Sequence, residues 1–561
     1  MKDEFVTLYT KEGESLSGQP WNIYPRPQMK RDSFFCLNGE WDFSVNGGDW
    51  EKITVPFPPE SALSGIGRRL GKSPAVKYRK TFSLPEGFLK GRVLLHFGAA
   101  DQRIFIELNG QGCAWHVGGY DAFCFDVTDY LQEENELTVE CSNLKPEHLL
   151  PYGKQREKRG GMWYTPITGI WQTVWLESVP EAYIQSLKID MGADFAEITT
   201  EGVTDGSVTV QTPEGEIQRN LAEGKVRIEI QNPRMWSPED PYLYNFTVES
   251  GEDKISSYFA LRTLETKTVD GIPRLCLNGK PYFFHGLLDQ GYYSDGIFTP
   301  ASPENYTRDI VEMKALGFNM LRKHIKVEPE HFYYECDRLG MIVFQDMVNN
   351  GKYSFLRDTA LPTVGMKKFP DKWLHRNKTA RLHFENGMRD TVQQLYNHPC
   401  ICYWTIFNEG WGQFDSAAMY EKLKALDSSR FIDATSGWFK GKKSDVESLH
   451  VYLKPVKITS CNKPVVLSEF GGYSYQPEGH IYHPGKPYGY RFFEDREKFE
   501  DALVALYETE IIPALPKGLC GAVYTQVSDV EDETNGLLSY DRKVLKVSPE
   551  RMLAIAEKLK L

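Results

Sequence analysis

Residues 401–409 read Ile-Cys-Tyr-Trp-Thr-Ile-Phe-Asn-Glu, an apolar run that ends in an amide and a carboxylate. A short apolar run of this kind is typical of a strand that is buried on both faces, as in a parallel sheet. Seven further runs in the same part of the chain predict strands, and helical stretches alternate with them. These runs are 282–287, 319–322, 341–344, 431–435, 448–452, 465–468 and 521–525. Eight such strands favour a closed (β/α)8 barrel over a doubly wound sheet, which is the alternative.

The chain ahead of this barrel predicts two β units. Short β-branched and aromatic runs alternate with turn residues in the first third, and Asn109-Gly110 is a hairpin signal, so we expect an antiparallel β-sandwich there. A second set of strands, spaced by Gly, Pro, Asp and Asn, suits a small immunoglobulin-like sandwich. The predicted domains are residues 1–180, 181–268 and 269–561.

Composition and charge exclude several classes of function. The chain has 561 residues with 65 basic and 77 acidic side chains, hence a net charge of −12, so nucleic acid is not an expected partner. No apolar run is long enough for a membrane span, and the N-terminus shows no secretory signal. Ten scattered cysteines without a C-x-x-C pair indicate reduced thiols, and we expect a cytoplasmic protein. The aromatic share of 13% indicates either large hydrophobic cores or stacking against sugar rings.

Polar side chains gather where the predicted barrel strands end, which is the catalytic face of such barrels. The fourth strand ends in Asn408-Glu409 and the seventh in Glu469, so two carboxylates project toward one mouth from nearly opposite sides. Such a pair suits glycoside hydrolysis, in which a protonated carboxyl group helps the leaving oxygen depart and an ionised one attacks the anomeric carbon. The ionised partner and partial burial would raise the pKa of the acid. A separation of about 5–5.5 Å would indicate a retaining mechanism.

The flanks of both glutamates resemble known motifs. Residues 404–410, Trp-Thr-Ile-Phe-Asn-Glu-Gly, and 465–471, Val-Val-Leu-Ser-Glu-Phe-Gly, are similar to the acid/base and nucleophile motifs of glycoside hydrolase family 2. That family includes β-galactosidases, β-glucuronidases and β-mannosidases. The stretch 37–43 is similar to its opening motif, and 118–123 and 169–172 resemble its jelly-roll motifs. The resemblance covers essentially the whole chain and implies a jelly-roll sugar-binding-like domain, an immunoglobulin-like domain and a catalytic TIM barrel.

The resemblance also implies roles for individual residues. Glu409 corresponds to the general acid/base and Glu469 to the nucleophile. Asn408 would hydrogen-bond the sugar 2-hydroxyl. Tyr452 would help to orient the nucleophile, and Arg322 would favour the ionised form of the nucleophile.

Four further residues are candidates for substrate binding. Asp346, after the third strand, binds a sugar hydroxyl or pairs with Arg322, and His450 faces the barrel interior or is a core histidine. Trp438, after the fifth strand, stacks on a sugar or packs at the rim, and Asp289 lies in the stretch 285–290 at strand one. No metal-binding spacing such as H-E-x-x-H occurs, so we expect neither a metal nor a cofactor. The expected partner is a small carbohydrate or glycoconjugate, and a homo-oligomer is left open.

Where the sequence departs from the family pattern, it does not determine which sugar the protein would bind. β-Glucuronidases carry an Asn-x-Lys pair that grips the uronate carboxylate, whereas this chain has Asn535-Gly536-Leu537 after strand eight. Lys323 and Lys326 are an alternative cationic clamp. We therefore expect a terminal β-galactoside first, a β-hexuronide (glucuronide or galacturonide) second and a β-mannoside third. The two leading β domains favour an exo-acting enzyme, because they would close one end of the cleft. An inactive carbohydrate-binding protein and a plain barrel endoglycanase are the alternatives.

Overall fold

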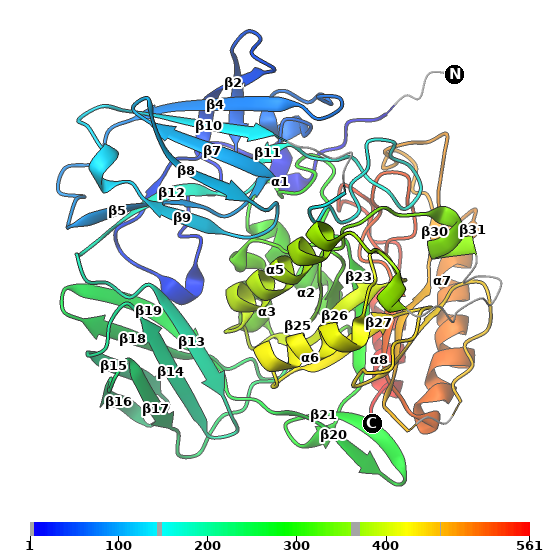
Figure 1. The fold of residues 1–561 in the computed structure, drawn as a ribbon. Coiled ribbons are helices and arrows are strands. Elements are labelled where there is room, and N and C mark those ends of the chain that lie inside the picture. The colour runs from blue at the N-terminus through cyan, green and yellow to red at the C-terminus, as the bar shows by residue number, and fades with distance from the viewer. Residues whose placement is uncertain (1–4, 143–147, 361–370, 460–461) are drawn as a thin grey trace.

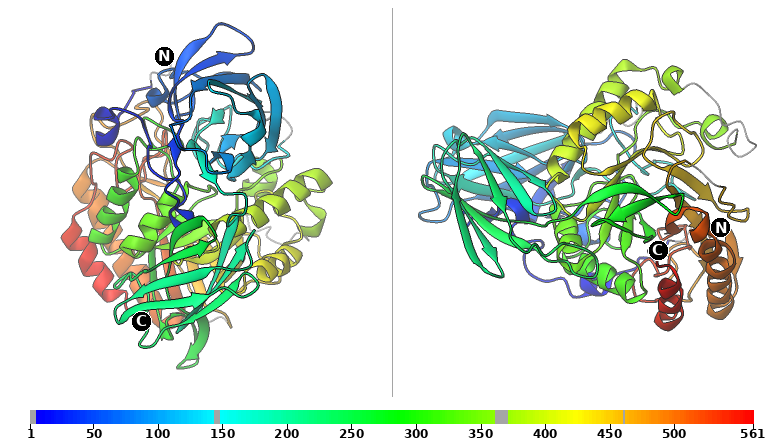
Figure 2. Two further views of the ribbon diagram at one scale, coloured as in Figure 1. Left: turned by 90° about the vertical axis from the view of Figure 1, so that its left-hand side faces the viewer. Right: turned by 90° about the horizontal axis from the view of Figure 1, so that it is seen from below.

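The computed structural model describes residues 5–142, 148–360, 371–459 and 462–561 (Figure 1). Two β-sandwiches precede an eight-stranded parallel barrel along the chain. Figures 1 and 2 show the two sandwiches stacked along one side of the barrel. The predicted fold class is therefore confirmed.

The first sandwich packs a four-stranded antiparallel sheet, in the order β1-β12-β5-β9, against a six-stranded one, in the order β3-β2-β4-β10-β7-β8. The bounds are β1 Phe35–Cys36, β2 Gly39–Val45, β3 Glu51–Val55, β4 Ala75–Phe82, β5 Arg92–Phe97, β7 Arg103–Leu108, β8 Gln111–Val117, β9 Phe123–Asp126, β10 Asn135–Ser142 and β12 Val174–Val179, with a small pair β6 Ala100–Asp101 and β11 Gly169–Ile170. Trp41 and Tyr78 are buried in its core. The predicted hairpin is present, because Asn109 and Gly110 connect β7 and β8 with φ angles of 55° and 74°.

The second sandwich pairs a three-stranded sheet, β13-β14-β17, with a four-stranded sheet, β16-β15-β18-β19. The bounds are β13 Ser186–Met191, β14 Phe195–Glu201, β15 Ser207–Thr212, β16 Gly215–Asn220, β17 Lys225–Glu229, β18 Tyr244–Ser250 and β19 Asp253–Phe259. Ile189, Val210 and Phe246 belong to its buried core. A short antiparallel unit then leads to the barrel: β20 Leu264–Val269, β21 Ile272–Leu277 and β22 Lys280–Pro281.

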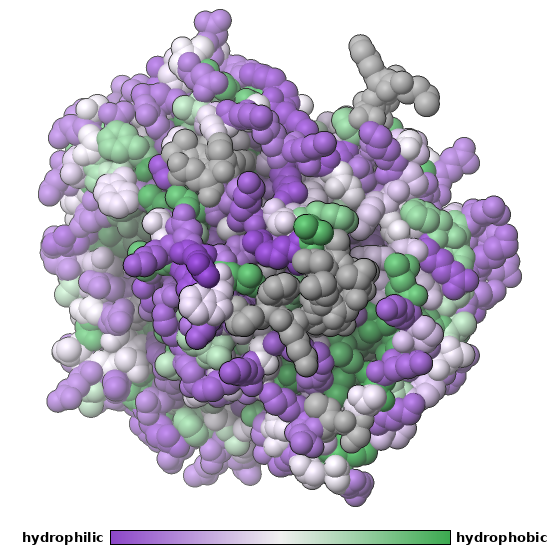
Figure 3. Space-filling model, turned by 45° about the vertical axis from the view of Figure 1, so that its right-hand side comes forward, coloured by the Kyte–Doolittle hydropathy of each residue, from purple (hydrophilic) through white to green (hydrophobic). Residues whose placement is uncertain are grey.

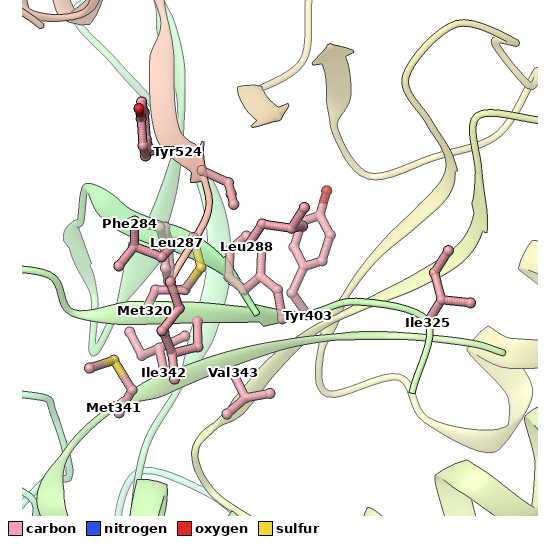
Figure 4. Close-up of a cluster of buried hydrophobic side chains, with 14 of the residues drawn as sticks. Phe284, Leu287, Leu288, Met320, Ile325, Met341, Ile342, Val343, Tyr403 and Tyr524 are labelled. Carbon is pink, nitrogen blue, oxygen red and sulfur yellow. The ribbon is translucent and has the colours of Figure 1, made fainter. Parts of the chain in front are cut away.

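The barrel strands occur at the eight predicted places. They are β23 Phe284–Asp289, β24 Met320–Lys323, β25 Ile342–Asp346, β26 Ile401–Asn408, β27 Phe431–Ser436, β28 Glu447–Val451, β29 Val465–Gly471 and β32 Leu519–Thr525. The first strand, β23, pairs in parallel with both β24 and the last strand, β32, which excludes a doubly wound order. The two remaining ends, β27 and β28, meet through side chains, since Ser436 Oγ lies 3.2 Å from Ser448 Oγ. Phe284, Leu287 and Tyr403 belong to the buried cluster among these strands (Figure 4).

Helices follow six of the eight barrel strands. They are α2 Glu304–Ala315, α3 Glu330–Leu339, α5 Lys378–Leu395, α6 Ser416–Leu426, α7 Arg496–Leu506 and α8 Pro549–Lys558, and a short α1, Lys11–Glu14, lies near the N-terminus. Within the described part of the chain no α-helix follows β27 or β28, although the sequence predicted eight β–α units. Gly437 and Gly441 interrupt the first of these connections and Pro455 the second, and both residue types disfavour a helix interior.

Residues 148–168 of the first sandwich lie across the carboxyl ends of the barrel strands, and we call them the mouth segment. The backbone N–H of Tyr152 donates to the carbonyl oxygen of Asn349, after β25, at 3.0 Å. The backbone N–H of Thr165 donates to Glu531 Oε1, after β32, at 2.8 Å. The first sandwich therefore forms part of the wall of the barrel mouth.

Three further features are the hydropathy of the surface, the state of the cysteines and the character of the helices. Hydrophilic side chains cover most of the face seen in Figure 3. All nine cysteines that the structure describes are free. Among the helices of the described residues, none combines the length and the apolar character that crossing a membrane requires.

Candidate active site

The two glutamates that the sequence singled out face each other across the barrel mouth. Glu409 directly follows β26, and Glu469 lies near the carboxyl end of β29. One oxygen of each carboxylate lies within 4.8 Å of the other. His450 of β28 lies between them, with Nδ1 2.9 Å from Glu409 Oε1 and 3.5 Å from Glu469 Oε2. The two glutamates are only 7% and 4% exposed, so the pair is shielded from bulk water.

The backbone at Glu409 is held in an unusual conformation. Its φ of 50° lies in the left-handed region, which costs a residue with a side chain on the order of 1 kcal/mol. The following Gly410 also has a positive φ of 78°, and a Cβ there would lie 2.3 Å from the ring of Phe439. A hydrogen bond from the Glu409 N–H to the carbonyl oxygen of Ser436, at 2.8 Å, fixes the turn to the neighbouring strand. The surrounding fold thus imposes the position of Glu409.

Three side chains hold the carboxylate of Glu469. Arg322 Nη1 donates to Oε1 at 3.0 Å, and the hydroxyl of Tyr452 donates to Oε2. Burial alone raises the pKa of Glu469, but the charges of His450 and Arg322 and the hydrogen bond from Tyr452 together hold this pKa below its ordinary value. Glu469 therefore stays ionised, which is the form that an attacking carboxylate needs.

Arg322 connects Glu469 to two other predicted site residues. Its Nε and Nη2 donate to the two oxygens of Asp346, each at 3.0 Å, and Nη2 also donates to Asn408 Oδ1 at 2.9 Å. Asp346 therefore pairs with Arg322, which is one of the two roles expected for it. Because a guanidinium group only donates, the oxygen end of the Asn408 amide must face it. The amide nitrogen of Asn408 is then the end that remains for a ligand.

The last two predicted binding residues, Trp438 and Asp289, do not contact the two glutamates among the described contacts. Trp438 is half-buried, and its ring lies edge-on to that of His450, with 6.5 Å between the ring centres. Asp289 does not join the glutamate cluster through any contact among the described residues. Its carboxylate instead binds Lys323 Nζ at 2.6 Å and accepts the backbone N–H of Gly291 at 2.9 Å.

The cationic clamp expected from Lys323 and Lys326 is wrong. Each ammonium group lies 2.9 Å from Glu328 Oε1, and Lys323 also binds Asp289. Lys326 donates in addition to the backbone carbonyl of Phe298 at 2.8 Å. Both lysine side chains are almost completely buried. Carboxylates of the chain itself therefore neutralise both charges, and neither is available to a substrate.

Sequence reasoning missed three aromatic residues beside the site, Tyr488, Tyr490 and Trp163. Tyr490 stacks on Tyr452 with 3.9 Å between the ring centres, and Tyr488 lies edge-on to Tyr490 at 6.2 Å. On the other side, Trp163 of the mouth segment stacks on Trp411, with 4.9 Å between the ring centres. The repeated aromatic residues of Tyr488-Gly489-Tyr490 were the available signal, but they lie about 20 positions beyond the end of their strand.

Lys154 of the mouth segment is the second feature that the sequence did not reveal. It is 7% exposed, and its Nζ lies 5.3 Å from the ring centre of Trp411 and 5.7 Å from that of Tyr164. Among the described residues it forms no salt bridge and its ammonium group donates no hydrogen bond. Its charge lowers the pKa of His324, after burial the second cause of that shift. Burial raises the pKa of Glu533 and the charge of Lys154 lowers it, yet the two groups form no salt bridge among the described residues. A buried ammonium group without a close anion is costly, so this arrangement favours an acidic ligand near Lys154.

Comparison with known proteins identifies the family. The model "Glycosyl hydrolases family 2, TIM barrel domain" matches residues 270–484, and "Glycosyl hydrolases family 2" matches residues 186–262. Together these matches cover just over half of the chain. The chain belongs to glycoside hydrolase family 2.

Relatives within family 2 differ in the sugar that their names record. A β-galactosidase from Thermoanaerobacter pseudethanolicus is 24% identical over 427 residues, 70% of this chain and 53% of that protein. A β-glucuronidase from Bacteroides fragilis is 23% identical over 426 residues, 70% of this chain and 58% of that protein. The chain thus spans about half the length of these curated relatives.

Solved structures share the fold over nearly the full chain. A β-glucuronidase from an uncultured Clostridium sp. superposes with a TM-score of 0.75 at 20% identity and covers 96% of this chain and 99% of its own. A family 2 β-galacturonidase from Eisenbergiella tayi, bound to galacturonate, gives a TM-score of 0.68 at 18% identity, with 96% and 99% coverage. At this level of identity the likeness establishes the fold.

The central cluster of this family 2 chain also has ligand types that bind metals. Glu409, His450 and Glu469 place one possible ligand atom each within 4.8 Å of one another. Arg322, however, already contacts Glu469 at 3.0 Å, and the positive charge of its guanidinium group repels a metal cation at this place. The expectation that no metal is needed stays a prediction, which chelation tests.

Proposed function

We propose that the protein is a retaining exo-β-glycosidase. The observation that carries this proposal is that one oxygen atom of the Glu409 carboxylate lies within 4.8 Å of one oxygen atom of the Glu469 carboxylate. Retaining glycosidases have their two carboxyl groups about 5–5.5 Å apart, whereas inverting enzymes leave about 6.5–9.5 Å for a water molecule. The short separation therefore favours a covalent glycosyl-enzyme.

Each glutamate has a distinct part in this mechanism. Glu469 attacks the anomeric carbon and forms an ester bond to the sugar, while Glu409 transfers its proton to the departing glycosidic oxygen. In the second step Glu409 removes a proton from water, and this water breaks the ester bond. Arg322 and Tyr452 support the ionised form of Glu469. In this proposal the amide nitrogen of Asn408, whose oxygen accepts from Arg322, donates to the sugar 2-hydroxyl.

For the sugar, the proposal places a β-hexuronide ahead of a neutral β-galactoside. The support is Lys154, a buried ammonium group over Trp411 that forms no salt bridge among the described residues, although its charge acts on Glu533. A hexuronide offers the carboxylate that this charge lacks, and a neutral sugar does not. The β-galactoside remains the second candidate, because relatives carry both names. A β-mannoside is the third.

The proposed exo action rests on the mouth segment. This stretch of the first sandwich crosses the barrel mouth and contacts loops after β25 and β32, so a long chain could not pass freely through the site. We propose that the substrate is a terminal β-linked glycoside and that the division at 1–180, 181–268 and 269–561 marks the domains. The free state of the nine cysteines that the structure describes supports a cytoplasmic location.

A panel of nitrophenyl glycosides tests this function. The panel contains β-glucuronide, β-galacturonide, β-galactoside, β-mannoside, β-glucoside and α-linked counterparts, each assayed with the wild-type protein and with Glu469→Gln. We expect release from a β-hexuronide with retained anomeric configuration, seen by NMR of the first product. Release from no member of the panel, or an inverted product, would contradict the proposal.

A further inference from the structure

Two cavities flank the mouth segment, and together we call them the basic groove. The first has a volume of about 740 Å³ and is lined by Tyr488 among others, and the second has a volume of about 400 Å³ and includes Tyr353. Lys72, Glu157 and Lys158 line both. Volumes of this size are typical of sites for small organic ligands.

Stacked aromatic side chains connect each cavity to the surroundings of the glutamate pair. In the first, Tyr488 contacts Tyr490, and Tyr490 stacks on the ring of Tyr452, whose hydroxyl group donates to the nucleophile candidate. In the second, Tyr353 lies edge-on to Trp411 at 5.6 Å between ring centres, and Trp411 follows the acid/base candidate by two positions. A ligand in the groove would therefore adjoin a sugar bound at the glutamates.

The charge of the groove is opposite to that of the whole chain. Its lining contains eight basic and two acidic residues, while the chain carries a net charge of −12. One of the two acids, Asp532, already binds Arg159 at 2.9 Å. Six of the basic residues form no salt bridge with any described residue: Arg69, Lys72, Arg103, Arg156, Lys158 and Lys352. The described part of the groove is thus a concentrated positive surface in which six basic residues are not paired with acidic ones.

The arginines are suited to carboxylates in particular. Arg156 lies over the rings of Trp163 and Tyr353, with its guanidinium carbon 4.0 Å and 4.7 Å from their centres. Stacking of this kind fixes the plane of the guanidinium group and leaves its N–H edges able to form paired hydrogen bonds with a carboxylate. A concave surface of one sign also raises the local concentration of ligands of the other sign.

We propose that the basic groove binds carboxylate-bearing sugars in the leaving group of the substrate, so that the natural substrate is an acidic oligosaccharide. This inference rests on the proposed function, because it places the groove on the leaving-group side of the scissile bond. In the proposed function, the glutamate pair and Lys154 contact only the sugar that is cleaved. The groove adds the requirement that the leaving group also carries negative charge.

Binding of an α-linked trigalacturonate tests the inference, since a β-glycosidase does not cleave it. Its affinity is measured by calorimetry with Glu469→Gln protein, alone and with Lys72→Ala/Lys158→Ala added. The matched control adds Lys225→Ala/Lys280→Ala, two exposed lysines outside the groove. Maltotriose serves as the neutral probe, and monomeric galacturonate as the probe that occupies the sugar pocket alone.

We expect trigalacturonate to bind, with an affinity that falls about tenfold or more in Lys72→Ala/Lys158→Ala and not in the control pair. The affinity should also fall in about 1 M sodium chloride, where charges are screened beyond about 3 Å. Binding of galacturonate should be the same in all variants. Equal binding of trigalacturonate and maltotriose, or equal affinity in both lysine pairs, overturns the inference even if the nitrophenyl panel is hydrolysed. Charge-dependent binding without hydrolysis of any glycoside overturns the proposed function instead.

Discussion

Arg322 lies 3.0 Å from Glu469 on one edge of its guanidinium group and 3.0 Å from both oxygens of Asp346 on another. The paired bonds to Asp346 fix the plane of the guanidinium group, so its remaining N–H bonds point in set directions toward Glu469 and Asn408. One buried cation therefore both orients Glu469 and keeps it charged. The predictions below follow from this arrangement and from the charges around it.

Replacing Glu469 by Gln should lower kcat on the order of 10⁴-fold or more, which equals about 5 kcal/mol of transition-state stabilisation. The amide has the shape of the carboxylate but cannot attack the anomeric carbon. Turnover of the preferred nitrophenyl glycoside measures the loss, and circular dichroism checks the fold. Glu557→Gln, at an exposed position of α8, is the matched control and should keep full activity. Near-normal turnover in Glu469→Gln would remove this residue from the reaction.

Glu409→Ala should slow substrates in proportion to their need for a proton. We expect kcat/KM for alkyl glycosides to fall roughly 10²–10⁴-fold, because the alkoxide leaves poorly without general acid catalysis. Dinitrophenyl glycosides, whose leaving group is a stable anion, should be affected much less in the first step. A series of leaving groups of graded pKa measures this dependence. A uniform loss across the series would contradict the acid role of Glu409.

Tyr452→Phe should move the acidic limb of the kcat/KM profile to higher pH. The pKa of Glu469 is lowered in the folded protein, so its charged form persists below its ordinary pKa and is lost only as pH falls toward the lowered value. Removing the hydroxyl takes away a hydrogen bond to the charged form and raises this pKa, by about one unit if the bond contributes about 1.5 kcal/mol.

Tyr490→Phe is the control for this pH experiment. It keeps the ring that stacks on Tyr452 but removes a hydroxyl for which no hydrogen bond to Glu469 is seen among the described residues. Its acidic limb should match that of the wild-type protein. An unchanged limb in Tyr452→Phe, or an equal shift in both variants, would speak against the role of the Tyr452 hydroxyl.

Lys154→Met should reduce kcat/KM for β-hexuronides roughly 30-fold or more, the effect of losing about 2 kcal/mol from a buried charge pair. The β-galactoside with the same nitrophenyl leaving group should lose little, because it offers no carboxylate. The ratio of the two rates is the readout, and Lys225→Met is the matched control. An unchanged ratio would show that Lys154 does not select the sugar.

Incubation with a strong chelator, followed by removal of the chelate, should leave turnover unchanged. The positive charge of Arg322 beside Glu469 disfavours a cation at the cluster of Glu409, His450 and Glu469. Activity that is lost on chelation and restored by one divalent metal would instead assign a metal to this cluster.

The sequence alone determined the barrel strands and the two glutamates. The hydrophobic pattern of a run such as 401–407 lies within the run itself. The side chain that follows a buried strand of a parallel barrel lies at the carboxyl face of the barrel, and this does not depend on contacts with the rest of the chain. The position of Arg322 at the same face could be predicted by the same reasoning, because Arg322 ends the predicted strand 319–322. These are local features, so they could be predicted before any contact was known.

Only the tertiary structure decided which charges are free. Lys323 and Lys326 were expected to be available but are neutralised by Asp289 and Glu328. Lys154, in the mouth segment, forms no salt bridge with any residue that the structure describes. Pairing depends on which groups the fold brings within a few ångströms, and burial then makes each unpaired charge costly. Sequence spacing carries no information on such long-range contacts, so the two glutamates of the proposed reaction could be predicted from the sequence, while the charges that we propose to select the sugar could not.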